Sequence, residues 1–167
     1  AFSGCEKLVH IFIPSSVKII EDYAFYSCPK LILTTIPFSV STIGINAFRE
    51  CVSLKQFSIP FSLELISKGA FYHCKSLRTI SLPSSIKSIG KRAFYQCPLE
   101  TISFPTSLTS IGKEAFIYCY SLTKITIPSS VFSIDIGAFS NCTNLREVVL
   151  SDNLDSISPS LFENCLS

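Results

Sequence analysis

The sequence predicts a solenoid of the α/β class, in which short parallel strands alternate with turns or short helical segments. Three observations predict it. A phrase beginning with Ala-Phe recurs every 23 residues, and once after 22, along the whole chain. Each of the first six copies holds a short alternating run that ends at proline, as a brief strand would. Hydrophobic residues make up 47% of the 167 residues, which supports a packed core.

The repeat unit defines the predicted domain organisation. Such self-similarity is typical of repeat proteins, in which no unit can bury its apolar face without neighbours. We therefore expect one domain over residues 1–167. Because the chain has no Met and begins and ends within the repeat, we expect it to be a segment of a longer protein. Copies one to seven begin at Ala1, Ala24, Ala47, Ala70, Ala93, Ala115 and Ala138, and a partial copy eight begins at Leu161.

The predicted strand lies in the middle of each copy. In copy four, "SLRTISL" places Leu77, Ile80 and Leu82 on the inner side, and its final part alternates as a strand does. Pro83 ends the strand, because proline has no N–H and holds the preceding residue in extended geometry. Copy five lacks one residue between Cys97 and Leu99, which we expect to fall in a turn without altering the sheet register.

The remainder of each copy predicts a turn and then a brief helical or 3₁₀ stretch. In copy four, Ile86, Ile89, Ala93, Phe94 and Cys97 are spaced by three, four, one and three residues. In three copies a glycine follows the second isoleucine, as expected at a position where the backbone can adopt a positive φ. These glycines are Gly44, Gly90 and Gly112. Other copies hold Glu21, Ser67, Asp135 and Ser158 there, so glycine is permitted rather than required.

Three columns of identical or similar residues are predicted to be structural. The phenylalanine column should form the spine of the core, and a serine column should hold hydroxyls that satisfy backbone groups in the turns. The serine column is Ser16, Ser39, Ser62, Ser85, Ser107, Ser130 and then Asn153. The phenylalanine column is Phe2, Phe25, Phe48, Phe71, Phe94, Phe116, Phe139 and Phe162.

The eight cysteines form the third column, three residues after each phenylalanine. A small thiol that faces the core fits this position, so we expect free, buried cysteines. Stacked side chains with parallel Cβ directions suit neither a disulfide nor a tetrahedral metal ion, and we predict no disulfide and no metal. The column is Cys5, Cys28, Cys51, Cys74, Cys97, Cys119, Cys142 and Cys165.

No catalytic or cofactor-binding residues are predicted, and the expected protein is not an enzyme. His73 and Cys74 are adjacent, but in this turn Cys74 should face inward and His73 outward, which argues against a dyad. The net charge of +2 without a basic block gives no reason to expect nucleic acid as a partner, and no apolar run could span a membrane. Lys68, Lys91 and Lys113 share one position, for which a solvated face is favoured over a patch for an acidic partner.

The strand phrase L-x-x-I-x-I resembles the leucine-rich repeat, and A-F-x-x-C with the strand-ending proline resembles its BspA-like class. The resemblance implies a right-handed horseshoe with a parallel sheet on the concave side and turns or short helical or 3₁₀ segments on the convex side. It also implies a cell-surface or secreted protein that attaches to host proteins or to cells. Fold alone does not establish this function.

Positions that the repeat does not dictate are the candidates for binding a protein partner. Gln56, Ser58, Thr79, Ser81, Thr101 and Ser103 should face the concave side. Phe38 and Phe61 follow the strand-ending proline and should form an aromatic patch at its flank, or else fold against a neighbouring coil. The leading hypothesis is a non-enzymatic, adhesin-like binding module. The alternative is a structural spacer within a longer repeat array. Uncapped ends should also favour end-to-end association of the segment.

Overall fold

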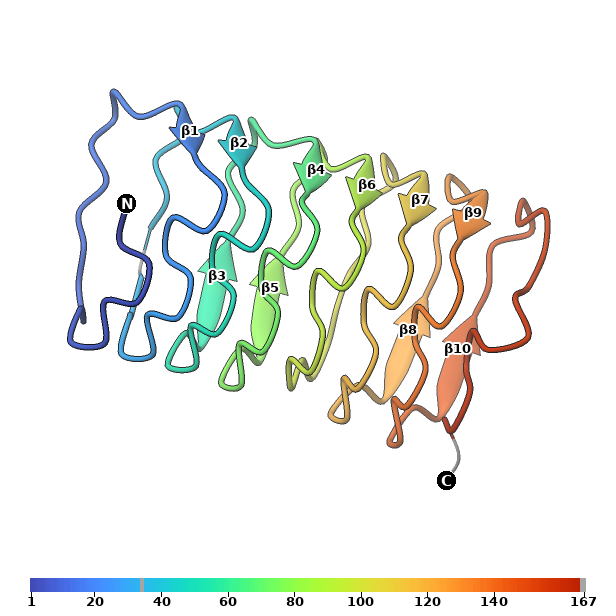
Figure 1. Ribbon diagram of the computed structural model, residues 1–167. Coiled ribbons are helices and arrows are strands. Elements are labelled where there is room, and N and C mark those ends of the chain that lie inside the picture. The colour runs from blue at the N-terminus through green and yellow to red at the C-terminus, as the bar shows by residue number, and fades with distance from the viewer. Residues whose placement is uncertain (34, 166–167) are drawn as a thin grey trace.

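The computed structural model describes residues 1–33 and 35–165 as one row of stacked coils, with the N- and C-termini at opposite ends (Figure 1). Each coil runs through extended segments and tight turns, and no helix forms in the described residues. The chain is therefore a parallel β-solenoid. The expected α/β class, with helical or 3₁₀ segments in each coil, is wrong.

Two rows of short parallel strands run along the stack. The first, here the long-strand row, is made by the predicted strand phrase. Its strands have three residues, and the central one is buried in β3, β5 and β8 but exposed in β10. In this row β3 pairs with β5 and β8 with β10, so that Phe57 lies beside Ile80 and Ile125 beside Val148. Its strands are β3 (Gln56–Ser58), β5 (Thr79–Ser81), β8 (Lys124–Thr126) and β10 (Glu147–Val149).

The second row, here the short-strand row, lies where the sequence suggested a turn. Its two-residue strands turn one residue outward and the next inward, and a continuous pairing aligns Ile66, Ile89, Ile111 and Ile134. Its strands are β1 (Ile19–Ile20), β2 (Thr42–Ile43), β4 (Leu65–Ile66), β6 (Ser88–Ile89), β7 (Ser110–Ile111) and β9 (Ser133–Ile134).

Left-handed residues explain why the rest of each coil does not form a helix. Around Ala93-Phe94, Arg92 has φ 53° and Gln96 has φ 54°, and the same two positions recur with positive φ in other copies. A left-handed residue every few positions interrupts any right-handed helix. The backbone instead bonds to the next coil, as where the Phe94 N–H donates to the Ala115 carbonyl at 2.8 Å.

The glycines that follow the second isoleucine of a copy allow adjacent coils to pack closely. Gly44, Gly90 and Gly112 do not have positive φ, contrary to expectation. A Cβ at Gly90 would lie 2.8 Å from both the Ile66 carbonyl oxygen and the Lys68 nitrogen of the preceding coil. A glycine here lets adjacent coils approach more closely than a side chain would.

The phenylalanine column is the spine of the core, as predicted. Consecutive rings stack nearly parallel, with Phe71 and Phe94 at 5.5 Å between centroids and 1° between planes. The five rings from Phe48 to Phe139 are fully buried. Seven pairs of neighbouring rings stack in this way along the chain.

The cysteine column is a ladder of hydrogen bonds as well as a set of buried side chains. Each thiol from Cys28 to Cys165 donates to the carbonyl of the phenylalanine in the preceding coil, at Sγ–O distances between 2.9 and 3.3 Å. Cys74, for example, donates to Phe48 at 3.2 Å. All eight cysteines are free. The column thus links neighbouring coils through a buried polar contact.

The serine column fulfils its predicted role in part. The hydroxyls of Ser39 and Ser107 donate to the carbonyls of Val17 and Ile86 in the preceding coil, each at 2.7 Å. Ser62 donates to the Val40 carbonyl, and Asn153 replaces serine by donating to Ser129 at 2.7 Å. The buried hydroxyls of Ser85 and Ser130 have no such partner.

Copy five interrupts the long-strand row. Residues 101–103 form no strand, whereas β5 and β8 flank them in the adjacent coils. Ile102 is still buried, so the inward pattern survives, but the ladder of the sheet does not. Because residues 101–103 form no strand, no strand pairing tests the expectation that the sheet register survives the one-residue deletion. The same positions of copy one, residues 10–12, also form no strand although that copy has no deletion. The short-strand row continues past the deletion through β6 and β7.

Candidate protein-binding surfaces

The six predicted contact residues of the strand phrase are all exposed. In the paired strands β3 and β5, Gln56 lies beside Thr79 and Ser58 beside Ser81, which brings four of the six onto one small sheet. Thr101 and Ser103 follow on the next coil, in the interrupted stretch rather than in a strand. The resulting surface is flat, uncharged and rich in hydroxyl groups.

Ion pairs between adjacent coils neutralise the charges that border this surface. Arg78 pairs with Glu100 at 2.7 Å. Lys124 pairs with Glu147 at 2.6 Å, and Lys87 pairs with Glu64 at 2.9 Å. These pairs are exposed and contribute little to stability, but they neutralise three of the cations beside the two strand rows.

Phe38 and Phe61 form an exposed aromatic pair. Their rings stack with centroids 6.1 Å apart and an interplanar angle of 24°, yet Phe38 remains 76% exposed and Phe61 68% exposed. The predicted alternative, in which they fold away against a neighbouring coil, does not occur: they contact each other and stay in water. Large aromatic side chains held at the surface in this way are typical of contact sites.

The aromatic pair belongs to a wider surface, here called the apolar corner, between the two strand rows in copies one to three. Phe12 is 86% exposed at the end of the strand phrase, while Ile19 and Leu65 are the outward residues of β1 and β4. In copies four to six the same repeat positions carry only small hydroxyl residues. These are Ser81, Ser84, Ser88, Ser103, Thr106, Ser110, Thr126, Ser129 and Ser133.

A third surface, missed by the sequence reasoning, lies on the turns that follow Ala-Phe. The six tyrosines of the chain all fall in or beside these turns. Tyr72 and Tyr95 stack with centroids 4.3 Å apart and planes 6° apart, and Tyr118 meets Tyr95 edge-on at 5.5 Å. The signal in the sequence was the third position of each copy, which holds tyrosine in copies two, four and five.

One arginine extends this row of tyrosines. We call the whole row the tyrosine ladder, and its members are Tyr26, Arg49, Tyr72, Tyr95, Tyr118 and Tyr120. The Arg49 guanidinium lies 4.1 Å from the centre of the Tyr72 ring and 5.8 Å from that of Tyr26, bridging copies two and four. His73 packs against Tyr72 and Tyr95. Burial, with the nearby Lys75 charge as a smaller cause, lowers the pKa of His73, which favours the neutral imidazole.

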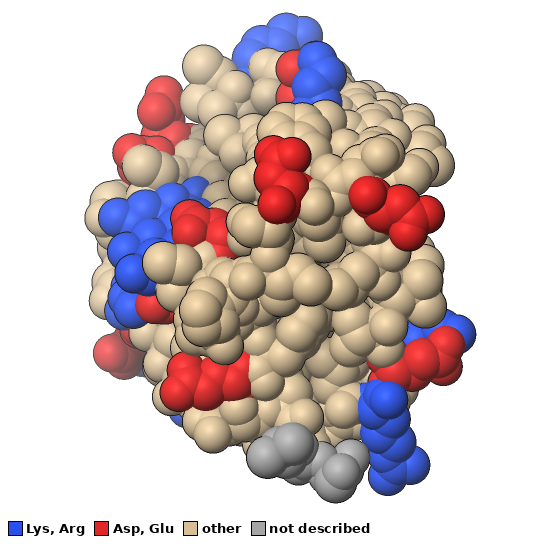
Figure 2. All heavy atoms as spheres, turned by 90° about the vertical axis from the view of Figure 1, so that its right-hand side faces the viewer, with Lys and Arg blue, Asp and Glu red and all other residues tan. Residues whose placement is uncertain are grey.

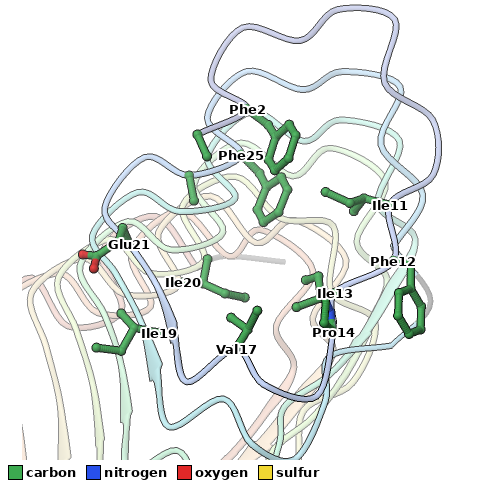
Figure 3. Close-up of a pocket in the computed structure, with 12 residues that line it drawn as sticks. Phe2, Ile11, Phe12, Ile13, Pro14, Val17, Ile19, Ile20, Glu21 and Phe25 are labelled. Atoms are coloured by element: carbon green, nitrogen blue, oxygen red, sulfur yellow. The ribbon is translucent and has the colours of Figure 1, made fainter.

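The N-terminal end of the stack is an open apolar cavity of about 310 Å³. Figure 3 shows Phe2, Ile11, Ile13, Val17 and Ile20 converging on it. These residues occupy positions that a preceding coil covers in the other copies. At the opposite end, uncharged atoms dominate the face, with separate acidic groups and the Lys and Arg side chains on the flanks (Figure 2).

The residues considered for catalysis and metal binding do not come together. His73 contacts tyrosine rings, whereas the Cys74 thiol is fully buried and donates to Phe48. Among residues 1–33 and 35–165, no three His, Cys, Asp or Glu side chains are placed to share a metal ion. In the same described ranges there is no helix both long and apolar enough to cross a bilayer.

Comparisons with solved structures agree with this geometry. A leucine-rich cell surface protein from Faecalibacterium prausnitzii is 27% identical, with a TM-score of 0.71 over 99% of this chain and 60% of its own. A leucine-rich repeat protein from Bacteroides ovatus is 27% identical, with a TM-score of 0.67 over 99% of this chain and 61% of its own. A leucine-rich repeat protein from T. pallidum is 28% identical, with a TM-score of 0.58 over 81% of this chain and 64% of its own.

The chain thus spans about 60% of the length of the first two of these structures. A search of curated protein sequences found no match. The family model for the BspA type leucine-rich repeat region, in six copies, matches residues 1–79 and 41–167. The repeat phrase, the stacked phenylalanines and these matches lead to one conclusion: the chain belongs to the BspA-type leucine-rich repeat family.

Proposed function

We propose that this chain is a non-enzymatic protein-binding module of an adhesin-like surface protein, which holds its partner on the long-strand row and the apolar corner. The expected concave-side residues Gln56, Ser58, Thr79, Ser81, Thr101 and Ser103 would form the floor of the contact. Phe38 and Phe61 would act as its anchors. The similarity to a leucine-rich cell surface protein supports a location at the cell surface or in the secreted fraction.

The observation that carries the proposal is the exposure of the aromatic pair. Two phenylalanine rings that stack on each other in water, at 76% and 68% exposure, add nothing to the core. A few aromatic residues commonly dominate the binding energy of a protein interface. The flat hydroxyl surface beside them has room for a partner that spans several coils, as an interface of roughly 800 Å² per partner requires.

The alternative is a structural spacer with the binding site elsewhere. A spacer would need no difference between copies, whereas the apolar corner occurs in copies one to three and hydroxyl residues replace it in copies four to six. This asymmetry favours the binding module.

The test begins with capture of host extracellular proteins or whole cells by the purified segment. The double variant Phe38→Ser/Phe61→Ser should weaken attachment at least about tenfold, because it removes both anchors. The control Phe132→Ser removes a phenylalanine that is 51% exposed in copy six, outside copies one to three, and should leave attachment unchanged.

A second variant tests the floor of the site. Thr79→Glu/Ser81→Glu/Ser103→Glu should also weaken attachment with little change in melting temperature, because these side chains face solvent. If both folded variants attach like the unaltered segment, the strand surface is not the binding site.

A further inference from the structure

The tyrosine ladder carries a second inference, which stands independently of the strand surface. Its rings are already stacked and its arginine already placed, so the surface is rigid before any partner arrives. Tyrosine and arginine are the residue types most enriched among binding hot spots. A preformed row of them loses little conformational entropy when it binds.

The charge around the ladder differs from that of the strand rows. The turns of copies three to five, with the start of copy six, carry six cations and only two carboxylates. Both carboxylates are already engaged: Glu50 pairs with Arg49 at 3.2 Å, and Glu114 pairs with Arg92. The cations are Arg49, Lys68, Lys75, Lys91, Arg92 and Lys113.

Three lysines remain without a carboxylate partner among the described residues, and they border the ladder on both sides. Lys68 and Lys91 precede the Ala-Phe pair of their coils, while Lys75 follows the Tyr72-His73 pair and lies close enough to influence His73. All three are exposed. On the strand rows, Arg78, Lys87 and Lys124 are each matched by a glutamate of an adjacent coil, whereas Lys18 and Lys55 form no ion pair among the described residues.

The ring geometry limits which anion can bind. The faces of Tyr72 and Tyr95 are turned toward each other and toward Arg49, so they are not available to stack on a sugar or a nucleobase. Ring edges carry partial positive charge, and tyrosine hydroxyls donate hydrogen bonds. The ring edges and hydroxyls of the tyrosines, together with the ammonium groups of the lysines, therefore form a surface that suits the binding of carboxylates.

We propose that the tyrosine ladder, flanked by Lys68, Lys75 and Lys91, is a docking site for an acidic polypeptide segment. The partner's carboxylates would contact the lysines and the tyrosine hydroxyls across copies three to five. Such contacts speed association and set specificity, and they weaken as salt screens the charges.

The experiment uses a fluorescein-labelled peptide of twelve alternating glutamate and glycine residues, with binding followed by fluorescence anisotropy. The unaltered segment should bind it, and affinity should fall several-fold between about 20 and 150 mM salt. Lys68→Gln/Lys75→Gln/Lys91→Gln should lose at least about tenfold in affinity. Tyr72→Phe/Tyr95→Phe keeps the stacked rings and should lose about two- to fivefold, because it removes two hydroxyl donors.

The matched control is Lys7→Gln/Lys18→Gln/Lys55→Gln, which changes the net charge equally at exposed lysines outside the turns of copies three to five. It should retain the affinity of the unaltered segment. Absence of peptide binding at low salt, equal loss in the control, or tighter binding of a single-stranded oligonucleotide or sulfated polysaccharide would each overturn the proposal. The Phe38 and Phe61 variants should bind this peptide normally, so failure of the strand-surface proposal would be seen separately.

Discussion

The buried thiols are more specific than their size alone suggests. Each one from Cys28 onward donates to a phenylalanine carbonyl of the preceding coil, so cysteine supplies both a small apolar volume and a hydrogen-bond donor. Alanine would fill less volume and donate nothing, and serine would bring a more strongly hydrated group into the core. This explains at the level of chemistry why the position holds cysteine in all eight copies.

These thiols predict a loss of stability at alkaline pH. Burial raises the pKa of Cys51, Cys74 and Cys119 above the ordinary value of 9.0. Above pH 9 the unfolded chain releases these protons while the folded chain retains them, so the free energy of unfolding falls as pH rises. Each such thiol contributes up to about 1.4 kcal/mol per pH unit.

Urea unfolding at pH 7.5, 9 and 10.5 measures this effect, because these values lie below, at and above the ordinary thiol pKa of 9.0. Cys51→Ala should be less stable at pH 7.5 but should show a shallower decline at high pH. Cys5→Ala, at a half-buried thiol of the open end, serves as the control for the destabilisation. An unfolding free energy that is independent of pH across this range would contradict the prediction.

At the scale of elements, the sequence located one row of strands and not the other. The strand phrase has three alternating residues and a terminal proline, enough for a recognisable pattern. The strands of the short-strand row have two residues, such as Ser88-Ile89, and two residues cannot display a period. Their formation depends on pairing with the neighbouring coil, which a single unit does not reveal.

The candidate surfaces were also predictable only where a single repeat unit reveals them. Exposure of the strand positions followed from alternation, and Phe38 and Phe61 stood out because they replace small residues. The tyrosine ladder did not stand out, because its members occupy three different positions of the repeat and an arginine replaces the tyrosine in copy three. Only the stacking of coils shows that Arg49 lies between Tyr26 and Tyr72.

The interruption in copy five predicts local opening. Residues 101–103 lack the sheet pairing of β5 and β8, so the amide hydrogens of Thr101–Ser103 should exchange faster than those of the two flanking strands. Insertion of one serine after Pro98 restores the 23-residue period and should slow this exchange. Insertion of one serine after Lys75, which lengthens a regular copy instead, is the control and should speed exchange in β5. Equal protection at residues 101–103 and in β5 would count against the interpretation.

At the scale of the whole molecule, the stack is stabilised by contacts between neighbours, and its ends lack one neighbour each. Phe2 is 38% exposed, while the five central phenylalanines of the column are fully buried. The cavity formed by Ile11, Ile13 and Val17 is likewise open only because no coil covers it. An isolated stack of this kind exposes apolar surface at its ends whatever its sides bind.

End-to-end association of the segment is the expected result. Light scattering should show an apparent mass that rises with concentration, and Ile13→Lys/Val17→Glu should suppress the rise by placing charges in the cavity. Ile32→Lys alters an isoleucine that is 45% exposed on the side of the stack and should not suppress it. A strict monomer at high concentration, with slow amide exchange in both terminal copies, would contradict this expectation.

The break in the long-strand row also has a mechanical consequence. The pairs β3–β5 and β8–β10 form two sheet blocks in the long-strand row. Between them residues 101–103 join no strand pair, although the Glu100 N–H still donates to the Arg78 carbonyl at 3.0 Å. The short-strand row stays continuous through β6 and β7, and the phenylalanine spine is unbroken. We therefore expect any bending of the stack to concentrate at copy five, where residues 101–103 join no strand pair while the phenylalanine contacts of the core are kept.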